Sequence, residues 1–572
     1  MRTGREVVPT PQPAQASARG DGSATAVTPA APGSPVIGVP AAGTAAVSRR
    51  EGALGLGVSR LGVPGWWPLL AVLAVQAVLS LRLVRANTAF QGEALYLWAG
   101  HQEWAHWLHG VPVPPFPAYF SGAPVIYPPI GALADSIGGL AAARILSLAF
   151  MLGATALLWG TASRLWGRRA AFFAAALFAL QGPVLHLGAF ATYDAMSVFL
   201  IAVAAWCVVR AGGKARAGER QGEWLDATGW MVAAGAALAL ANAAAYSSAL
   251  FDPVVLVLAL VTALPRPGGK LAAGRCATLL IVVGVLVLAG LLTGGSSYLT
   301  GIDQTTLERV ASADSPLVVL AHSWSWSGLV VVLAVGGVAV SWVTRQGRAR
   351  TWLLAVLTSA ALLGPLEQAR LHTLASLNKH VGLGAWFAAI AAGYAVDRFI
   401  AAAPAGRPRA QTCVACVVAL AFPLTLGAGQ SREFATDWPD STAFTAILRP
   451  LAAPGTGRLL VEDPSIAEYY LPTGTRWQRW SSTRNIILPS GASTDGPSRT
   501  QGVTGAGNAP AFAKFIAEGY FSVVALNFAD TTALDHRITA DLHRNHHYHY
   551  VQVIPYGPGG TYVIWRYEQQ PQ

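Results

Sequence analysis

The chain has 572 residues, of which 53% are hydrophobic and only 12% are charged, and its mean hydropathy is +0.44. Soluble domains carry about 25% charged residues, so this composition excludes a soluble globular protein and indicates a chain that crosses a membrane several times. The net charge of +11 does not indicate nucleic-acid binding, because the basic residues lie in short clusters between apolar runs.

Residues 1–60 are rich in Ala, Pro, Gly, Ser and Thr and show no apolar periodicity. Such a segment cannot bury a core, so we expect a disordered tail. No apolar stretch near Met1 is long enough for a signal peptide, and three arginines precede the first apolar run. We therefore expect the tail to stay in the cytoplasm.

Apolar runs of about 20 residues, the length that crosses ~30 Å of hydrocarbon, recur along residues 61–428. We predict an α-helical, polytopic membrane domain with about eleven transmembrane helices. The predicted spans are residues 65–84, 137–160, 169–188, 193–210, 228–246, 249–264, 276–293, 325–344, 351–367, 381–399 and 410–428. The two short Ala-rich runs between 228 and 264 also fit a re-entrant segment.

Basic residues alternate between the loops and predict the orientation. The Arg- and Lys-rich loops are residues 164–169, 210–220, 265–275, 345–350 and 398–410. Because such loops stay in the cytoplasm, the N-terminus is expected inside, and the loop after the first span and the C-terminus are expected outside.

Residues 429–572 have a different character. Short β-rich runs such as "YFSVVALNFAD" and "GTYVIWRYE" alternate with Gly/Pro turns and with helical stretches such as "PAFAKFIAEG". We predict an extracytoplasmic α/β domain, interrupted by a flexible loop at residues 488–510.

Ionisable residues near membrane depth are costly and tend to mark functional sites, and four groups of them fall at the predicted outer ends of the spans. The first is Glu93 with Tyr96 and His101, which share one face if "QGEALYLWAGH" is a helix. An interfacial helix with an aromatic belt and a solvated acid is the alternative interpretation.

The second group is "APVIYPPIGALAD", where Tyr127 and two prolines predict an extended entry into the second span. A rigid turn without chemistry explains this pattern equally well. The third is Asp194, near the outer start of the span at 193–210. An acid in a first helical turn also serves as a cap or a dipole partner.

The fourth group is "LEQARLHTLASLNKHV", residues 366–381. Read as a helix, it places His372, Ser376, Lys379 and His380 on one face, with Arg370 nearby. A cationic face suits a phosphate group, whereas snorkelling of these side chains toward lipid headgroups is the alternative. Acids and cations together fit a lipid-phosphate substrate, because a carboxylate deprotonates an acceptor hydroxyl and cations stabilise the departing phosphate.

From residue 65 to the C-terminus the chain resembles the GT-C membrane glycosyltransferases, in the branch of protein O-mannosyltransferases and the aminoarabinose transferase of lipid A (glycosyltransferase family 39). The resemblance lies in an acidic loop after the first span, Pro-Pro before the second, an acid opening the fourth, and a terminal outer domain. It implies transfer of a sugar from a polyprenyl-phosphate carrier to an acceptor on the outer face of the cell membrane.

The family's first-loop Asp-Glu pair aligns with Gly92-Glu93, so the position of the family's Asp base is a glycine. The resemblance therefore leaves open whether Glu93 or Asp194 is the base, or whether the activity has drifted. It implies Tyr96, His101 and Tyr127 as substrate contacts. It also implies that the cations and histidines of the fourth group contact the carrier phosphate, namely Arg370, His372, Lys379 and His380.

We expect no metal cofactor, because the acidic pair is broken and because His546 and His549 have no acid or Cys placed to complete a site. A divalent ion, which some GT-C enzymes hold with paired acids, is the less favoured alternative. The expected partners are the lipid bilayer, a polyprenyl-phosphate-linked sugar and an unidentified extracytoplasmic acceptor, with no nucleic acid. Two rival functions remain, a transporter and a non-catalytic protein of cell-envelope assembly. A transporter is disfavoured because the chain shows no paired halves.

Overall fold

The computed structural model describes residues 66–118, 120–214, 221–263, 269–309, 311–402, 409–453, 455, 457–471, 477–484, 486–487, 493–494, 509–556 and 560–568. The expected cytoplasmic tail, residues 1–60, and most of the expected loop at 488–510 lie outside these residues.

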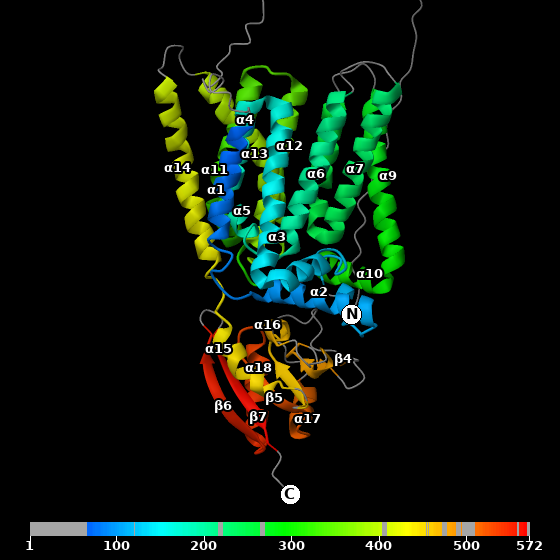
Figure 1. Ribbon diagram of the computed structural model, residues 1–572, viewed down its shortest axis with the longest axis vertical. Helices are drawn as coiled ribbons and strands as arrows, with labels where there is room; N and C mark the ends of the chain where they lie inside the picture. The colour runs from blue at the N-terminus through cyan, green and yellow to red at the C-terminus, as the bar shows by residue number, and fades with distance from the viewer. Residues whose placement is uncertain are drawn as a thin grey trace, which may run out of the picture. The chain divides into compact units, whose positions relative to one another are not determined.

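The first part of the described chain is a bundle of helices, which we call the membrane domain (Figure 1). Its helices are α1 (Trp67–Leu81), α2 (Gln91–His109), α3 (Tyr127–Trp166), α4 (Arg168–Ala179), α5 (Gly182–Leu187), α6 (Tyr193–Lys214), α7 (Gln221–Ala244), α8 (Asp252–Ala263), α9 (Gly269–Gly294), α10 (Ser296–Ile302), α11 (Pro316–Val343), α12 (Arg348–Arg370), α13 (Leu377–Ala401) and α14 (Arg409–Phe434). Within the described residues, eight helices are long and apolar enough to cross a membrane, and α1 is a shorter apolar helix. The protein is therefore a multi-pass membrane protein.

The predicted spans are present in the structure, with differences at 169–188 and at 410–428. The span predicted at 169–188 is two short helices, because Gln181 is extended and Pro183 starts α5. The two Ala-rich runs between 228 and 264, for which a re-entrant segment was the alternative, both appear as candidate spans. The span predicted at 410–428 lies within α14, which passes the predicted domain boundary at 428 and ends at Phe434.

Burial divides the spans between core and lipid boundary. α13 is the most buried of the candidate spans, and its small residues let neighbouring helices approach closely. At Gly384, a Cβ would lie 2.4 Å from the carbonyl oxygen of Ala360 on α12. α9 is the least buried span and exposes leucines and valines along most of its length, as expected for a helix that faces lipid.

Helix α2 is not a span, and it lies across the ends of the upright helices (Figure 1); we call these ends the α2 end. It packs on the start of α3, where Trp104 Nε1 donates to the carbonyl of Pro129 at 2.8 Å. The expectation of an extended chain at Tyr127-Pro128-Pro129 is wrong, since these residues form the first turn of α3. Proline is tolerated there because the first N–H groups of a helix have no intrahelical partner. α3 then bends at Gly138 and Gly139 before it enters the bundle.

The C-terminal part is an α/β domain, as predicted. Its five-stranded sheet has the order β2-β1-β5-β7-β6, in which β1 is parallel to β2 and β5 while β7 is antiparallel to β5 and β6. The strands are β1 (Arg458–Val461), β2 (Trp480–Ser481), β5 (Phe521–Leu526), β6 (Tyr548–Pro555) and β7 (Thr561–Tyr567), and β3 (Ile486–Ile487) pairs with β4 (Ser493–Thr494).

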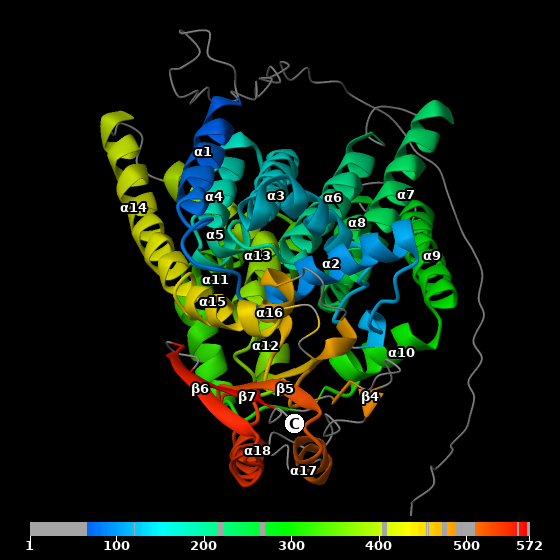
Figure 2. The ribbon, with the colours of Figure 1, turned by 60° about the horizontal axis from the view of Figure 1, so that its bottom comes forward.

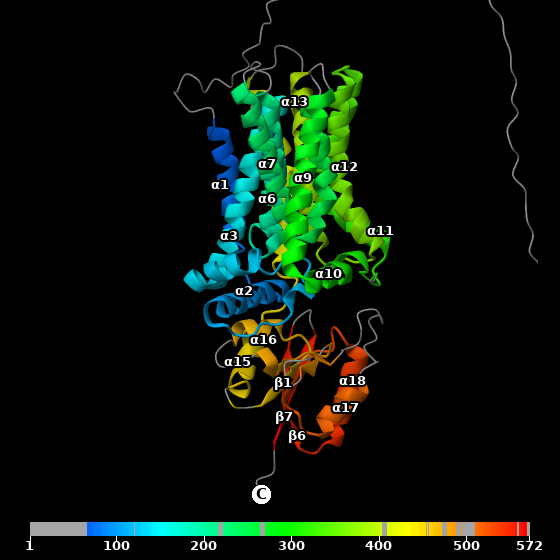
Figure 3. The same cartoon turned by 90° about the vertical axis from the view of Figure 1, so that its right-hand side faces the viewer.

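Helices cover both faces of this sheet (Figure 3). α15 (Thr442–Leu451) and α16 (Ser465–Tyr470) pack on one face, and α17 (Ala509–Ala517) and α18 (Thr532–Arg544) pack on the other. Successive residues of one strand serve the two cores, because side chains alternate along a strand: Val523 belongs to the first core and Val524 to the second.

A buried acid lies at the carboxyl ends of strands β1 and β5 and binds the loop that follows β5. The Glu462 carboxylate, directly after β1, accepts hydrogen bonds from four backbone N–H groups of the loop after β5, those of Asn527, Phe528, Asp530 and Thr531. The Thr531 hydroxyl in turn donates to Asp535 Oδ1 at 3.0 Å. Burial, together with repulsion from Glu462, raises the pKa of Asp535 to about 8.

Gly100 lets α2 approach the backbone of α3 closely. A Cβ there would lie 1.9 Å from the carbonyl oxygen of Pro128, which is backbone and cannot give way. We expect overpacking in Gly100→Ala to lower the free energy of unfolding by about 1–3 kcal/mol. The melting temperature of the detergent-purified protein should fall accordingly. The control is Gly229→Ala on α7, where a Cβ meets nothing within 4 Å and alanine favours the helix. Equal melting temperatures for the two variants would contradict this packing.

The raised pKa of Asp535 makes the stability of the α/β domain depend on pH. The folded protein binds the Asp535 proton more tightly than the unfolded chain does. The contribution of this proton to the free energy of unfolding is therefore complete at about pH 4 and below, and it is lost as the pH rises toward about 8. We expect Asp535→Asn to remove this loss. At pH 8 the free energy of unfolding should rise by on the order of 1–3 kcal/mol, and the melting temperature should rise with it. Melting curves of both proteins from pH 4 to 9 test this, and parallel curves would refute it.

Candidate active site

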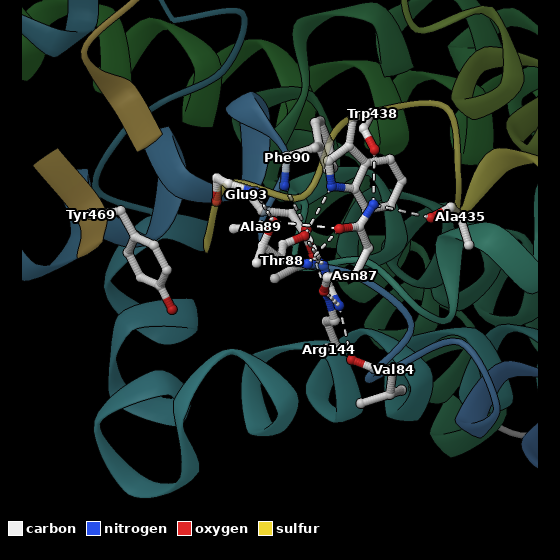
Figure 4. Close-up of polar contacts among 12 residues, drawn as sticks. Val84, Asn87, Thr88, Ala89, Phe90, Glu93, Arg144, Ala435, Trp438 and Tyr469 are labelled. Carbon is white, nitrogen blue, oxygen red and sulfur yellow. Dashed lines mark hydrogen bonds and ion pairs between the residues drawn. The ribbon is translucent and has the colours of Figure 1, made fainter. Parts of the chain in front are cut away.

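The first acid of the site, Glu93, is completely buried in an ion pair with Arg144 (Figure 4). Its carboxylate accepts two hydrogen bonds from the guanidinium, from Nε at 2.8 Å and from Nη2 at 2.6 Å. Its other two acceptor positions take the backbone N–H groups of Phe90 at 3.3 Å and of Ala191 at 2.7 Å. Since a carboxylate offers about four such positions, Glu93 has none left for a proton from a substrate.

Arg144 uses its remaining donors on the segment between α1 and α2. It donates to the carbonyl oxygens of Val84, Asn87 and Thr88 at 2.8, 2.9 and 3.1 Å. A buried guanidinium requires this saturation, because every unpaired donor would keep its desolvation cost. The pair thus fixes α2, α3 and the chain before α6 at one point.

The second acid, Asp194, stands in the first turn of α6 and is also buried. Its Oδ2 forms no hydrogen bond, and Lys379 Nζ from the first turn of α13 lies 3.5 Å away. The Lys379 ammonium is buried too and lies 5.2 Å from the centre of the Phe90 ring. The structure therefore brings together an acid and a cation from two of the four predicted groups, and the acid keeps an acceptor atom free of hydrogen bonds.

Two tyrosines adjoin Asp194. The rings of Tyr96 on α2 and Tyr193 on α6 lie 4.7 Å apart, and both interact electrostatically with Asp194. Burial, together with the neighbouring Tyr193 and Asp194, raises the pKa of Tyr96 well above its usual value. Tyr127 is fully buried within electrostatic range of Glu93 and Asp194, and its hydroxyl lies beside Ser147. Tyr96 and Tyr127 thus lie close to Asp194.

The glycine that replaces the family's acid has a structural partner. A Cβ on Gly92 would lie 2.7 Å from the Phe90 ring. That ring packs against Phe190 and Trp438, with centroids 5.8 and 5.6 Å apart. In this conformation the Phe90 ring occupies the space into which a side chain at position 92 would begin.

The remaining predicted site residues lie elsewhere. His101 pairs with Asp135 at 2.8 Å, and Asp135 also accepts from the Tyr469 hydroxyl at 2.7 Å. Arg370 is exposed and forms a bidentate pair with Glu367. His372 lies beside the carbonyl of Asp314 at 3.2 Å, and the His380 ring contacts the Gln368 amide.

The prediction of one helix through residues 366–381 is wrong, which explains this scatter. α12 ends at Arg370 and α13 begins at Leu377, and between them His372 and Ser376 have positive φ angles of 50° and 64°. Left-handed residues break the helical register, so the five residues do not share a face. Lys379 alone of them pairs with Asp194.

Arg144 is the residue that sequence reasoning missed. It is the charged residue inside the apolar run predicted as a span at 137–160, and an ionisable residue at such a position is itself a signal of a site. Phe90 and Trp438, in contrast, carried no signal, because they come together only through the fold.

In the part of the chain that the structure describes, no group of three or more His, Cys, Asp and Glu side chains is arranged to hold a metal ion. The prediction that the reaction needs no metal cofactor remains a prediction.

Residues 135–293 match the model of the dolichyl-phosphate-mannose-protein mannosyltransferase family. Among solved structures, ArnT from Cupriavidus metallidurans bound to undecaprenyl phosphate matches with a TM-score of 0.56 and 16% identity, over 89% of this chain and 100% of that chain. The archaeal oligosaccharyltransferase AglB from Archaeoglobus fulgidus, in complex with an inhibitory peptide and a dolichol-phosphate, matches with a TM-score of 0.50 and 15% identity, over 88% of this chain and 74% of that one. No curated protein sequence matches the chain.

ArnT and AglB are both GT-C glycosyltransferases. This chain has the GT-C fold. The resemblance inferred from the sequence is thereby confirmed, and the matched family segment contains Arg144 and Asp194 while Glu93 and Lys379 lie outside it. The likeness extends through the α/β domain, since the match with ArnT covers most of this chain.

The saturated network around Glu93 predicts a structural role for this acid. Glu93→Gln leaves the Arg144 guanidinium buried without its carboxylate. We therefore expect the free energy of unfolding to fall by about 3–5 kcal/mol, with a clear drop in melting temperature. Glu367→Gln is the control, because its pair with Arg370 is exposed and such pairs contribute about 0–1 kcal/mol. Thermal unfolding in detergent compares the two, and an unchanged Glu93→Gln protein would contradict this role.

Proposed function

We propose that this protein is a membrane glycosyltransferase that moves a sugar from a polyprenyl-phosphate carrier to an acceptor on the outer face of the membrane. The observation that carries this proposal is the buried Asp194–Lys379 pair, in which Asp194 Oδ2 is free of hydrogen bonds and the ammonium is 3.5 Å away. A base for the acceptor and a cation for the phosphate are thus side by side in a GT-C fold. The lipid phosphates bound to ArnT and AglB support the same class of donor.

The apolar surroundings of Lys379 suit a polyprenyl chain. A row of aromatic rings leads from Phe90 over Phe190, His186 and Phe434 to Trp326, with neighbouring centroids 3.9–5.8 Å apart. Trp326 also lines a small pocket between the end of α4, α11 and α14, three helices that Figure 2 shows on one side of the bundle. A carrier chain that lies against these helices would place its phosphate at the end of the row, beside Lys379.

In the proposed reaction, the acceptor hydroxyl attacks the anomeric carbon of the sugar and the bond from that carbon to the phosphate oxygen breaks. The hydroxyl proton passes to Asp194 Oδ2, and the charge that develops on the departing phosphate is stabilised by Lys379. We assign Asp194 as the base because its Oδ2 keeps a free acceptor position, whereas all positions of Glu93 are used. Glu93 then acts as a positioning residue.

The tyrosines around Asp194 suit the sugar. Because the pKa of Tyr96 is raised, its hydroxyl keeps its proton and can donate to a sugar oxygen. The buried Tyr127 hydroxyl, beside Ser147, offers a second such group. The direct contacts proposed from the sequence for His101, Arg370, His372 and His380 remain predictions, and the mechanism above does not use them.

We further propose that the α2 end faces the cell exterior, with the N-terminus in the cytoplasm and the α/β domain outside. The Arg-rich loops between the spans support this orientation. The α/β domain contacts α2 directly, since the Ala89 N–H donates to the Tyr470 hydroxyl at 2.8 Å. An acceptor held by that domain would therefore lie close to Asp194.

Asp194→Asn is the decisive variant, because it keeps the shape of the side chain and removes its ability to take a proton. We expect release of polyprenyl phosphate from labelled polyprenyl-phosphate sugars to fall about 10²–10⁴-fold in kcat. Glu518→Gln, at an exposed site directly after α17, is the matched control and should keep wild-type turnover. The assay uses full-length protein in lipid nanodiscs with a panel of candidate acceptors.

Wild-type turnover in Asp194→Asn would exclude this residue as the base. If the wild-type protein binds polyprenyl phosphate tightly but releases none from the labelled donors with any acceptor of the panel, the proposed enzyme activity is overturned and the non-catalytic role is favoured. Movement of the intact lipid-linked sugar between leaflets would instead favour a transporter.

A further inference from the structure

A second group of charges lies at the end of the membrane domain opposite to Asp194. Arg210 stands sixteen residues after Asp194 on α6, about 24 Å along the helix at 1.5 Å per residue. One turn before it, the Trp206 indole packs against Gly160 of α3, where a Cβ would lie 2.7 Å from the ring. The ring is therefore held against the backbone of a neighbouring helix.

Two guanidinium groups stack around this indole. Arg164, one turn after Gly160 on α3, places its Cζ 3.9 Å from the centre of the Trp206 ring. Arg210 lies 5.7 Å from the same ring and 5.2 Å from the ring of Trp230 on α7. Three helix ends thus combine two arginines and two tryptophans in one cluster, which we call the arginine–tryptophan platform: Arg164, Trp206, Arg210 and Trp230.

The platform has two positive charges and no paired acid. Among the described residues, neither Arg164 nor Arg210 forms an ion pair or a hydrogen bond, and the two guanidiniums are close enough to repel each other. Other arginines near this end have an acidic partner, since Arg169 and Arg398 share the carboxylate of Asp397. Like charges held together on a fixed surface are unfavourable unless an anion joins them.

We propose that the arginine–tryptophan platform binds the phosphate of an anionic phospholipid headgroup. Guanidinium groups bind phosphate oxygens in pairs, and cation–π contact with the indoles holds the two guanidiniums near one another while it leaves their N–H groups free to donate. Tryptophans at the ends of membrane spans mark the headgroup level, where a lipid phosphate lies. Arg164 is exposed and Arg210 is partly exposed, so a headgroup can reach both. This site is independent of the proposed transfer reaction at the other end of the bundle.

The test is lipid binding by the full-length protein, measured by native mass spectrometry from detergent with phosphatidylglycerol, phosphatidylcholine or inorganic phosphate as the probe. We expect the wild-type protein to prefer phosphatidylglycerol over both other probes. The Kd for phosphatidylglycerol should rise about tenfold in Arg164→Gln and in Arg210→Gln, and further in the double variant.

The control is the double variant Arg348→Gln/Arg350→Gln, which removes the same charge from the exposed start of α12 without an aromatic partner in the structure. It should bind phosphatidylglycerol like the wild type. Melting temperatures of the lipid-free variants identify any variant that is unfolded. If the Arg164→Gln/Arg210→Gln double variant is unfolded, the two single variants test the proposal.

Three results would overturn the proposal. The first is a wild-type affinity for phosphatidylglycerol in both single variants. The second is a loss of affinity in the control variant as large as in the platform variants, which would indicate diffuse charge. The third is binding of phosphatidylcholine as tight as that of phosphatidylglycerol. Inorganic phosphate that binds as tightly as phosphatidylglycerol would assign the platform to a free anion in place of a lipid.

Discussion

The buried pair of Glu93 and Arg144 is the interaction on which the rest of the site depends. Taking two charges out of water costs several kcal/mol for each ion, and only complete pairing offsets that cost. Here the carboxylate accepts two guanidinium and two backbone hydrogen bonds, and the guanidinium also donates to three carbonyl oxygens. The pair is satisfied only when α2, α3, the chain before α2 and the chain before α6 are all in place. One of its partners, Ala191, lies three residues before Asp194, so the pair also fixes the start of α6.

The segment that Arg144 holds also anchors the α/β domain. Asn87 Nδ2 donates to the carbonyl of Trp438 at 2.8 Å, and Trp438 Nε1 donates to the carbonyl of Thr88 at 2.9 Å. The Thr88 hydroxyl accepts from the Ser441 N–H at 3.0 Å, just before α15. The short chain between α1 and α2 therefore links the candidate base, the buried ion pair and the second domain. A disturbance of Arg144 would reach all three.

Local patterns explain how much of this could be predicted from the sequence. The spans and the strands follow from apolar runs and alternation, which neighbouring residues carry by themselves. Glu93, Asp194 and Lys379 stand out as charges beside apolar segments. The break at 371–376 was missed because His372 and Ser376 adopt positive φ without a glycine or proline to signal it. The pairing of Asp194 with Lys379, and of Glu93 with Arg144, depends on helices that are distant in the chain, so only the fold determines which acid is saturated and which is free.

The glycine at position 92 then has a physical interpretation. With no side chain at 92, the Phe90 ring lies over that position and reaches within 5.2 Å of the Lys379 ammonium. A ring face attracts a cation, so the Phe90 ring stabilises the ammonium beside Asp194. A carboxylate at position 92 would have to displace Phe90 from Phe190 and Trp438. The glycine at 92 therefore accommodates an aromatic ring beside the buried cation, and Asp194 is the acid that pairs with that cation.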